Sequence, residues 1–209
     1  MTRPVQLSIF NHVLHMFEEH RLSPSFGYVF DRRWLDPYES IVSILWKFVR
    51  VNALAGHVVA GELGREDVDP YAGSEAHREA IDLPRLRRTL GVSQKVLREA
   101  LIPAARRDAL SLCFRYCPRC LTRGYHAVVH QFESVRRCPI HDRRLETACR
   151  RCGHEAPYRL NARRLETPYR CAQCRSIYGS HWPRIPDRLG MPMKELIPMT
   201  RAHIERCRY

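Results

Sequence analysis

The chain has 209 residues, 44% of them hydrophobic, so it is long enough for one large domain or two small ones with an apolar core. Its net charge of +13 comes from 32 arginines and only three lysines, and the excess of base over acid predicts contact with a polyanion, either nucleic acid or an acidic protein. The longest apolar stretch, around residues 41–51, is interrupted by polar side chains, which excludes a membrane span. Cysteines in close pairs, together with no recognisable secretion signal, predict a reducing, bacterial cytoplasmic setting.

Two helical segments are predicted in the first quarter of the chain. Residues 5–20 have the pattern of an amphipathic helix, whose apolar face would pack on the core or, alternatively, bind a partner. A second helix is expected from Ser40 to about Asn52, with Asp36 as its N-cap and Pro37 at its first position. Because this second helix is apolar on most sides, we expect it at the centre of the core. Gly56 and Gly61 are expected to interrupt regular structure in the segment that follows.

A helix-turn-helix is predicted in the next part of the chain. Leucines at helical spacing precede the turn Gly91-Val92-Ser93, and Ser93 is suited to cap a second helix that ends at Pro103. In a DNA-reading unit the outward side chains of that helix would enter the major groove. These candidate nucleic-acid contacts are Gln94, Lys95 and Arg98. A plain helical hairpin with a solvated face is the alternative.

Four pairs of metal-ligand residues follow within 58 residues, each pair spaced by two residues. They are Cys117 and Cys120, Cys138 and His141, Cys149 and Cys152, and Cys171 and Cys174. Eight such donors fill two tetrahedral Zn2+ sites, and sites with four protein ligands have no open position for catalysis, so two structural zinc ions are predicted. Sequential pairing is favoured because the intervals within the two units are 17 and 18 residues long, while an interleaved arrangement remains open.

Side chains near these pairs allow further, less specific predictions. Arginines beside the second pair predict general phosphate binding, and they are Arg136, Arg137, Arg143 and Arg144. Cys113 is expected to be a small buried residue, and His126 and His130 are expected to be solvated. No phosphate loop, nucleophile elbow or acidic Mg2+ cluster is found, so the chain is not expected to be an enzyme.

The expected fold is mainly α with small zinc-stabilised α+β modules, in which a helical helix-turn-helix domain is followed by two tandem zinc-binding units. We place an N-terminal extension at 1–35, the helical domain at 36–110, the tandem zinc-finger domain at 111–178 and a C-terminal tail at 179–209. The tail is expected to contain a short helix around Met199 to Cys207.

Several motifs in one order give the chain a family resemblance. They are Asp36-Pro-Tyr-Glu-Ser40 with Ile44-Leu-Trp and Val51-Asn52, then Leu90-Gly-Val-Ser93, then Arg115-Tyr-Cys-Pro-Arg-Cys-Leu121, Cys138-Pro-Ile-His141, Cys149-Arg-Arg-Cys-Gly153 and Cys171-Ala-Gln-Cys174. This series, over roughly residues 36–178, resembles the TniQ/TnsD family of transposon targeting proteins. By this likeness, the eight paired residues are the zinc ligands.

The resemblance implies an accessory protein of DNA transposition. Members of the family help to choose the insertion site and link a targeting element, either DNA-bound or RNA-guided as in CRISPR-associated transposons, to an AAA+ ATPase that engages the transposase. The sequence ends about 35 residues after Cys174, without room for the second helix-turn-helix domain of long members, which favours the short, adaptor form. A homodimer is an open alternative to a monomer, and a zinc-containing helix-turn-helix DNA-binding regulator is the alternative function.

Overall fold

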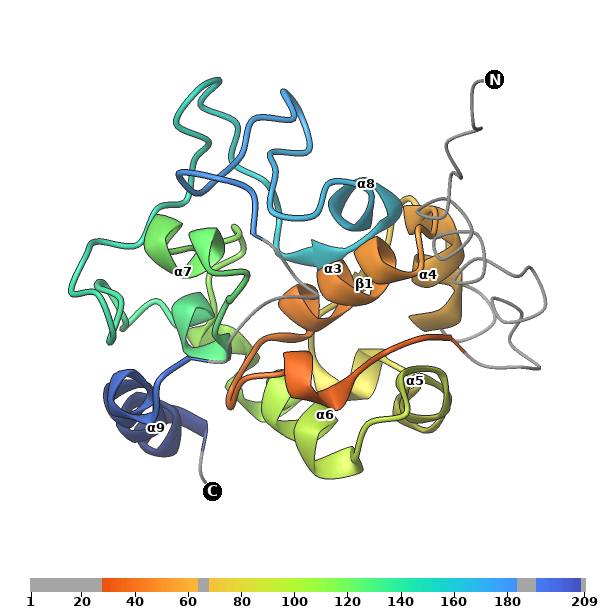
Figure 1. The fold of residues 1–209 in the computed structure, drawn as a ribbon, viewed down its shortest axis with the longest axis horizontal. Helices are drawn as coiled ribbons and strands as arrows, with labels where there is room; N and C mark the ends of the chain where they lie inside the picture. Colours follow the sequence, from red (N-terminus) through yellow and green to blue (C-terminus); the bar gives the residue numbers. More distant parts are fainter. Residues whose placement is uncertain (1–27, 64–67, 184–190, 208–209) are drawn as a thin grey trace, which may run out of the picture.

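A computed structural model describes residues 28–63, 68–183 and 191–207, and Figure 1 shows helices packed around one small sheet. The predicted helix at 5–20 lies outside the described residues. The α-helices are α3 (Ile41–Val51), α4 (Gly56–Leu63), α5 (Leu83–Leu90), α6 (Gln94–Ala100), α7 (Pro118–Thr122), α8 (Ala162–Leu165) and α9 (Met193–Cys207). The 3-10 helices are η1 (Arg32–Trp34), η2 (Arg78–Ala80), η3 (Ala104–Ala109) and η4 (Val128–Gln131). The mainly helical class is thus confirmed in its coarse form.

The sheet joins two short strands that are far apart in the sequence. Strand β1 (Ser74–Glu75) pairs antiparallel with β2 (Arg159–Leu160), in a register that places Ser74 opposite Leu160. One strand precedes the predicted zinc-finger domain and the other lies inside it. The described sheet therefore connects the two predicted domains.

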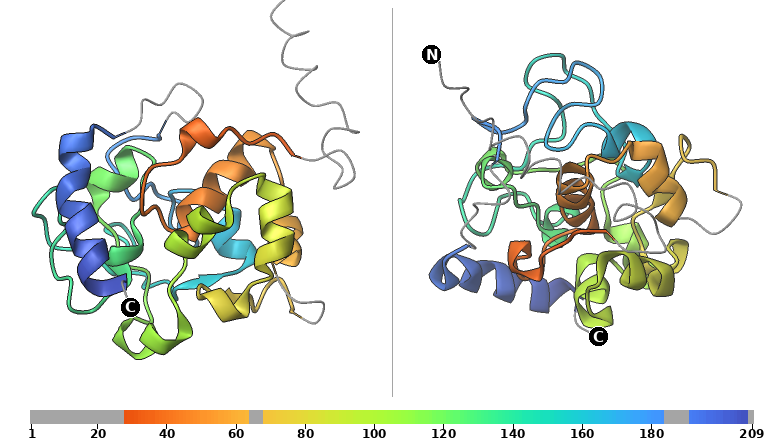
Figure 2. Two further views of the ribbon diagram at one scale, coloured as in Figure 1. Left: turned by 90° about the horizontal axis from the view of Figure 1, so that it is seen from below. Right: turned by 45° about the vertical axis from the view of Figure 1, so that its right-hand side comes forward.

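Helix α3 lies at the centre of the molecule, as its apolar sequence predicts (Figure 2). The predicted span of Ser40 to about Asn52 agrees with α3, but the predicted cap was wrong, because Tyr38 has a positive φ of 59° and the helix begins only after it. Ser40, rather than Asp36, is the N-cap, and its Oγ accepts a hydrogen bond of 3.3 Å from the backbone N–H of Ser43.

The core around α3 takes side chains from both sides of residue 110. The indole Nε1 of Trp46 donates a 2.7 Å hydrogen bond to the backbone oxygen of Arg164, and the Trp46 ring lies 4.9 Å from that of Tyr169 and 5.7 Å from that of Phe114. All three rings are buried. The predicted helical and zinc-finger domains therefore share one hydrophobic core, and their boundary near residue 110 stays a prediction.

Helices α5 and α6 lie at the positions that the sequence predicts. Gly91 ends α5 in the left-handed conformation with φ 63°, and the Oγ of Ser93 caps α6 by accepting from the backbone N–H of Val96 at 3.3 Å. Two helices and a turn are therefore present, whereas a DNA-binding helix-turn-helix domain remains a prediction.

The C-terminal helix α9 is longer than predicted and begins six residues before Met199, at Met193. Its buried apolar side chains, Leu196, Met199 and Ala202, belong to a second core cluster with Val128 and Val129 of η4, which α9 contacts. Within the described part of the chain, no helix is long and apolar enough to cross a membrane.

Helix α4 was not predicted, because Gly56 and Gly61 were interpreted as interruptions. Gly56 is required by close packing, since a Cβ there would lie 2.3 Å from the backbone oxygen of Ala162 in α8. At Gly61, in the same helix, a Cβ would meet nothing within 4 Å. Gly56 thus allows α4 and α8 to touch, whereas Gly61 lies at a position in α4 where a side chain would have free space.

We expect Gly56→Ala to lower the free energy of unfolding by about 1–3 kcal/mol, because α4 must move away from α8. Gly61→Ala is the matched control and should raise it by up to about 1 kcal/mol through helix propensity. Urea unfolding of both variants measures the two effects. Equal stabilities of the two variants would contradict the close packing of α4 on α8.

Candidate metal centres

The first centre is formed by Cys117, Cys120, Cys138 and His141, whose ligand atoms all lie within 4.8 Å of one another. Cys117 precedes α7 and Cys120 lies within it, so one helical turn brings both sulfurs to the same side. Cys138 and His141 come from a tight turn, in which the backbone N–H of Asp142 donates to the oxygen of Cys138 at 2.9 Å.

The second centre is formed by Cys149, Cys152, Cys171 and Cys174, again with all ligand atoms within 4.8 Å. Its two turns repeat the geometry of the Cys138 turn. The N–H of Gly153 donates to the oxygen of Cys149 at 2.8 Å, and the N–H of Arg175 donates to that of Cys171 at 2.9 Å. Asp142, Gly153 and Arg175 all have positive φ, which bends the chain back after each ligand pair.

The donor distances of the first centre match a tetrahedral zinc ion. Bonds of ~2.3 Å to sulfur and ~2.0 Å to nitrogen give a tetrahedron with S···S edges of about 3.8 Å and S···N edges of about 3.5 Å. The sulfurs of Cys120 and Cys138 are 3.6 Å apart, and the Nδ1 of His141 lies 3.5 Å from the sulfur of Cys117 and 3.3 Å from that of Cys120.

The second centre has the same dimensions. The sulfurs of Cys149 and Cys174 are 3.6 Å apart, and those of Cys152 and Cys171 are 3.7 Å apart. The nine cysteines, all of them among the described residues, form no disulfide. The donors therefore fit two metal ions, in the sequential pairing that the spacing favoured, and four protein donors in each leave no open coordination position.

The two centres differ in their exposure to solvent. In the first, all three cysteines are buried and His141 is half-buried, whereas in the second Cys152 is exposed and Cys174 is half-buried. Cys113 belongs to neither centre and is half-buried rather than buried as expected.

A chelator should therefore remove the metal of the four-cysteine centre first. We expect two kinetic phases of zinc release with EDTA, at least tenfold apart in rate, measured with a colorimetric zinc indicator. Cys152→Ser should abolish the fast phase and leave the slow one. A single phase in the wild type would contradict an effect of exposure on metal release.

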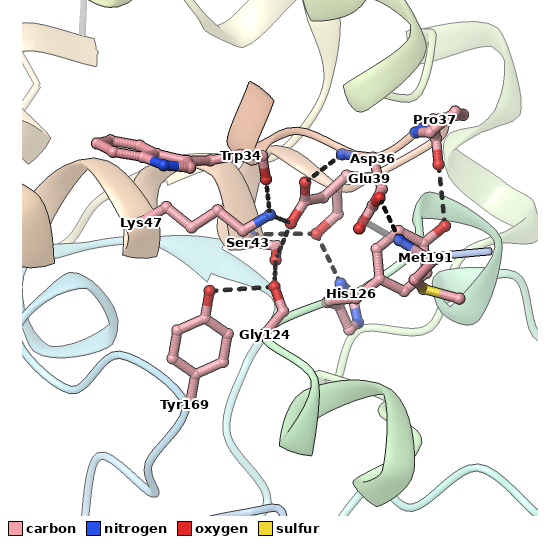
Figure 3. Close-up of polar contacts among 12 residues, drawn as sticks. Trp34, Asp36, Pro37, Glu39, Ser43, Lys47, Gly124, His126, Tyr169 and Met191 are labelled. Carbon is pink, nitrogen blue, oxygen red and sulfur yellow. Dashed lines mark hydrogen bonds and ion pairs between the residues drawn. The ribbon is translucent and has the colours of Figure 1, made fainter. Parts of the chain in front are cut away.

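A buried polar cluster, which the sequence interpretation missed, connects α3 to the segment that follows the first cysteine pair (Figure 3). Glu39 and Lys47 form an ion pair with side chains that are only 1% and 0% exposed. The Oγ of Ser43 donates to Glu39 at 2.6 Å, and the Nζ of Lys47 donates to the backbone oxygen of Trp34 at 2.7 Å. Burial raises the pKa of Glu39 and lowers the pKa of Lys47, while the charge of each partner opposes both shifts.

His126 is buried in the same cluster, so the expectation that it is solvated was wrong. Its Nε2 lies 2.8 Å from the backbone oxygen of Arg115, which can only accept, so Nε2 carries the proton. The hydroxyl of Ser40 then donates to Nδ1 at 2.6 Å. Burial holds the pKa of His126 well below its usual value, so the imidazole is neutral and joins α3 to the zinc-binding region.

His130 is also fully buried, contrary to the same expectation. It lies in η4, whose four residues are too few to show an amphipathic pattern by which to place it. Burial lowers the pKa of His130 to about 4. Neither histidine is a ligand of the two centres.

The predicted nucleic-acid contacts lie on two elements. Gln94, Lys95 and Arg98 are exposed on α6, where Lys95 lies 3.9 Å from Glu99. The other four are exposed on the chain that leads into and out of the Cys138–His141 turn, and they are Arg136, Arg137, Arg143 and Arg144. The structure thus places every one of these side chains on the surface.

The geometry defines the chain as a mainly helical protein with two closed Cys/His centres that are suited to structural metal ions. No protein-family model matches it, and no curated protein matches it either.

Proposed function

We propose that the chain is an accessory target-selection protein of DNA transposition, a short TniQ-like adaptor in the bacterial cytoplasm. It links a DNA-bound or RNA-guided targeting complex to an AAA+ ATPase and, through it, to the transposase. The observation that carries this proposal is the order of the family-like motifs, together with the fact that the last four of them form two centres of four ligands each.

The packing of these motifs supports the proposal. The Glu39-Ser40 motif lies at the start of α3, and Ser40 is hydrogen-bonded to His126, just after the first cysteine pair. Trp46 of the next motif is hydrogen-bonded to the backbone of Arg164, between the cysteine pairs of the second centre. Segments that resemble one family along the sequence thus lie in one packed body, as expected of a common fold.

The chemistry of the centres supports an adaptor rather than an enzyme. A zinc ion with four protein ligands lacks the coordination position in which zinc hydrolases activate water. We therefore propose that both zinc ions are structural and that the surfaces of the chain bind partner macromolecules, including a second copy where the adaptor acts as a dimer.

Co-purification with the products of neighbouring genes tests the proposal. We expect the tagged, zinc-loaded chain to bind an AAA+ ATPase, and a transposition assay with that ATPase and its transposase to lose targeted insertion when the chain is omitted. Adding back Cys113→Ser should restore insertion, because this cysteine lies outside both centres. Normal targeted insertion without the chain would refute the proposal.

The exposed side chains of α6 favour one second candidate, a sequence-specific DNA-binding regulator. In that case Lys95→Ala and Arg98→Ala would each lose ~1–3 kcal/mol of discrimination between an operator and random duplex. Selection of bound fragments from genomic DNA identifies an operator if there is one. Recovery of unrelated sequences alone would remove this candidate.

A further inference from the structure

Two adjoining grooves lie beside the first metal centre and are lined by arginine. The larger has a volume of about 900 Å³ and runs along the two arms of the chain that hold the Cys138–His141 turn. The smaller, of about 520 Å³, lies between that turn and α9. Both grooves include Arg136 and Arg137, so they form one continuous surface. We call it the arginine surface, and its exposed arginines that form no ion pair with a described acidic residue are Arg136, Arg143, Arg144 and Arg201.

The backbone and the metal centre fix the positions of these side chains. The N–H of Leu145 donates to the oxygen of Arg136 at 3.0 Å, and the N–H of Cys138 donates to that of Arg143 at 2.8 Å. Arg137 and Arg144 form a bridge of antiparallel type between the same two arms. Arg136, Arg143 and Arg144 therefore lie on a hydrogen-bonded hairpin whose end is closed by the first centre, and Arg201 lies on α9 beside it. In Figure 1 this hairpin extends from the body on the same side as α9.

The charge of the arginine surface is not neutralised within the described part of the chain. Its acidic neighbours are already engaged: Asp142 with Arg137 at 2.6 Å, Glu146 with Arg150 at 2.7 Å and Glu205 with Arg206 at 2.9 Å. Among the described residues, none forms a hydrogen bond through its side chain with the guanidinium of Arg136, Arg143, Arg144 or Arg201. Four exposed guanidinium groups on one surface repel one another, and a bound polyanion would remove this repulsion.

The side chains that line the grooves indicate which polyanion fits. Guanidinium groups bind phosphate through paired N–H donors. No Phe, Tyr or Trp lines either groove, whereas proteins that bind single-stranded nucleic acid stack bases on aromatic rings. The smaller groove has apolar lining near α9, including Ile197 and Pro198, but the larger groove, which holds Arg143 and Arg144, has only Leu145 and Ala148, which is little for the anchors that a peptide ligand requires. These features favour the backbone of a double helix.

We propose that the arginine surface binds the phosphate backbone of duplex DNA without reading its sequence. This inference rests on the proposed function in one respect, that the target of transposition is duplex DNA. It places the DNA contact on the first metal centre and α9, and it makes the side chains of α6 unnecessary for that contact. It also adds Arg201, which the sequence interpretation did not select.

Fluorescence anisotropy of the zinc-loaded full chain with two unrelated 20-base-pair duplexes tests this proposal. We expect equal affinities for the two sequences and a steep fall in affinity with salt. The triple variant Arg136→Ala/Arg143→Ala/Arg144→Ala should bind at least tenfold more weakly at 100 mM salt, with the slope of log K against log salt reduced by about 3. Arg201→Ala alone should reduce the slope by about 1.

A matched control removes the same charge elsewhere. Arg87→Ala/Arg88→Ala/Arg163→Ala changes three exposed arginines outside both grooves and should weaken binding less than threefold. The variants should retain two zinc ions and the melting temperature of the wild type, because all the changed side chains are exposed. Arg→Lys at the three groove positions should keep most of the salt slope.

Three outcomes would overturn the proposal. These are wild-type binding by the groove variant, equal losses in the groove variant and the control, and tighter arginine-dependent binding of single-stranded RNA, duplex RNA or polyglutamate than of duplex DNA. Failure of the proposed function is distinguishable, because loss of the ATPase interaction with intact arginine-dependent DNA binding would refute the adaptor role alone.

Discussion

Replacing Cys120 with serine is expected to unfold the region around the first metal centre and to leave one zinc ion per chain instead of two. A structural zinc site contributes folding free energy on the order of 10 kcal/mol, far more than the packing of one side chain. Cys120 is fully buried and belongs to the core cluster that holds α9. Loss of the metal should therefore also release α9 from its packing on η4.

Elemental analysis and hydrogen exchange measure this outcome. The zinc content should fall to about one per chain with the remaining ion in the second centre, and amides of α9 should exchange as fast as in an unfolded peptide. Cys171→Ser should remove the other ion and leave α9 protected. Cys113→Ser is the control, because this half-buried cysteine lies outside both centres, and it should keep two zinc ions. Two retained ions in Cys120→Ser would contradict a four-donor centre.

The centres could be predicted from the sequence because their geometry is local. Each ligand pair lies within one turn, so the spacing of the residues alone places the two donor atoms on the same side. The helices α3, α5 and α6 were predicted for the same reason, since their apolar periodicity and their turn residues are contained in the segment itself. The exact cap was missed because the left-handed conformation of Tyr38 has no marker in its residue type.

The buried polar cluster could not be predicted, because it depends on contacts between distant parts of the chain. Ser40 and His126 are 86 residues apart, and no local pattern in the sequence indicates that they meet. Lys47 lies on the polar row of an otherwise apolar helix. A lysine at such a position can face solvent as readily as a buried partner. The carboxylate of Glu39 faces Lys47 and Ser43 inside the core, which its position just before the helix does not reveal.

Lys47→Met should lower the free energy of unfolding by about 3–5 kcal/mol, because removing one member of a buried ion pair leaves the other charge without compensation. Met is close to Lys in length, so the effect reflects the charge and the lost hydrogen bond to Trp34 more than a cavity. The double variant Glu39→Gln/Lys47→Met removes both charges and should lose less stability than Lys47→Met alone. Lys194→Met, at an exposed position of α9, is the control and should change stability by less than about 0.5 kcal/mol.

The pH dependence of the stability of Lys47→Met tests whether the unpaired carboxyl of Glu39 causes the loss. Burial raises the pKa of Glu39, and the charge of Lys47 opposes that rise, so removing Lys47 raises the folded-state pKa of Glu39 further. A carboxyl whose folded pKa exceeds its unfolded value stabilises the fold while protonated, at low pH, and this contribution is lost as the pH rises through the folded pKa. The deficit of Lys47→Met relative to the wild type should therefore be smaller at pH 5 than at pH 8, in denaturant unfolding with zinc present. A deficit that stays constant over this interval, or a double variant as unstable as Lys47→Met, would show that the loss arises from packing rather than from the charge of Glu39.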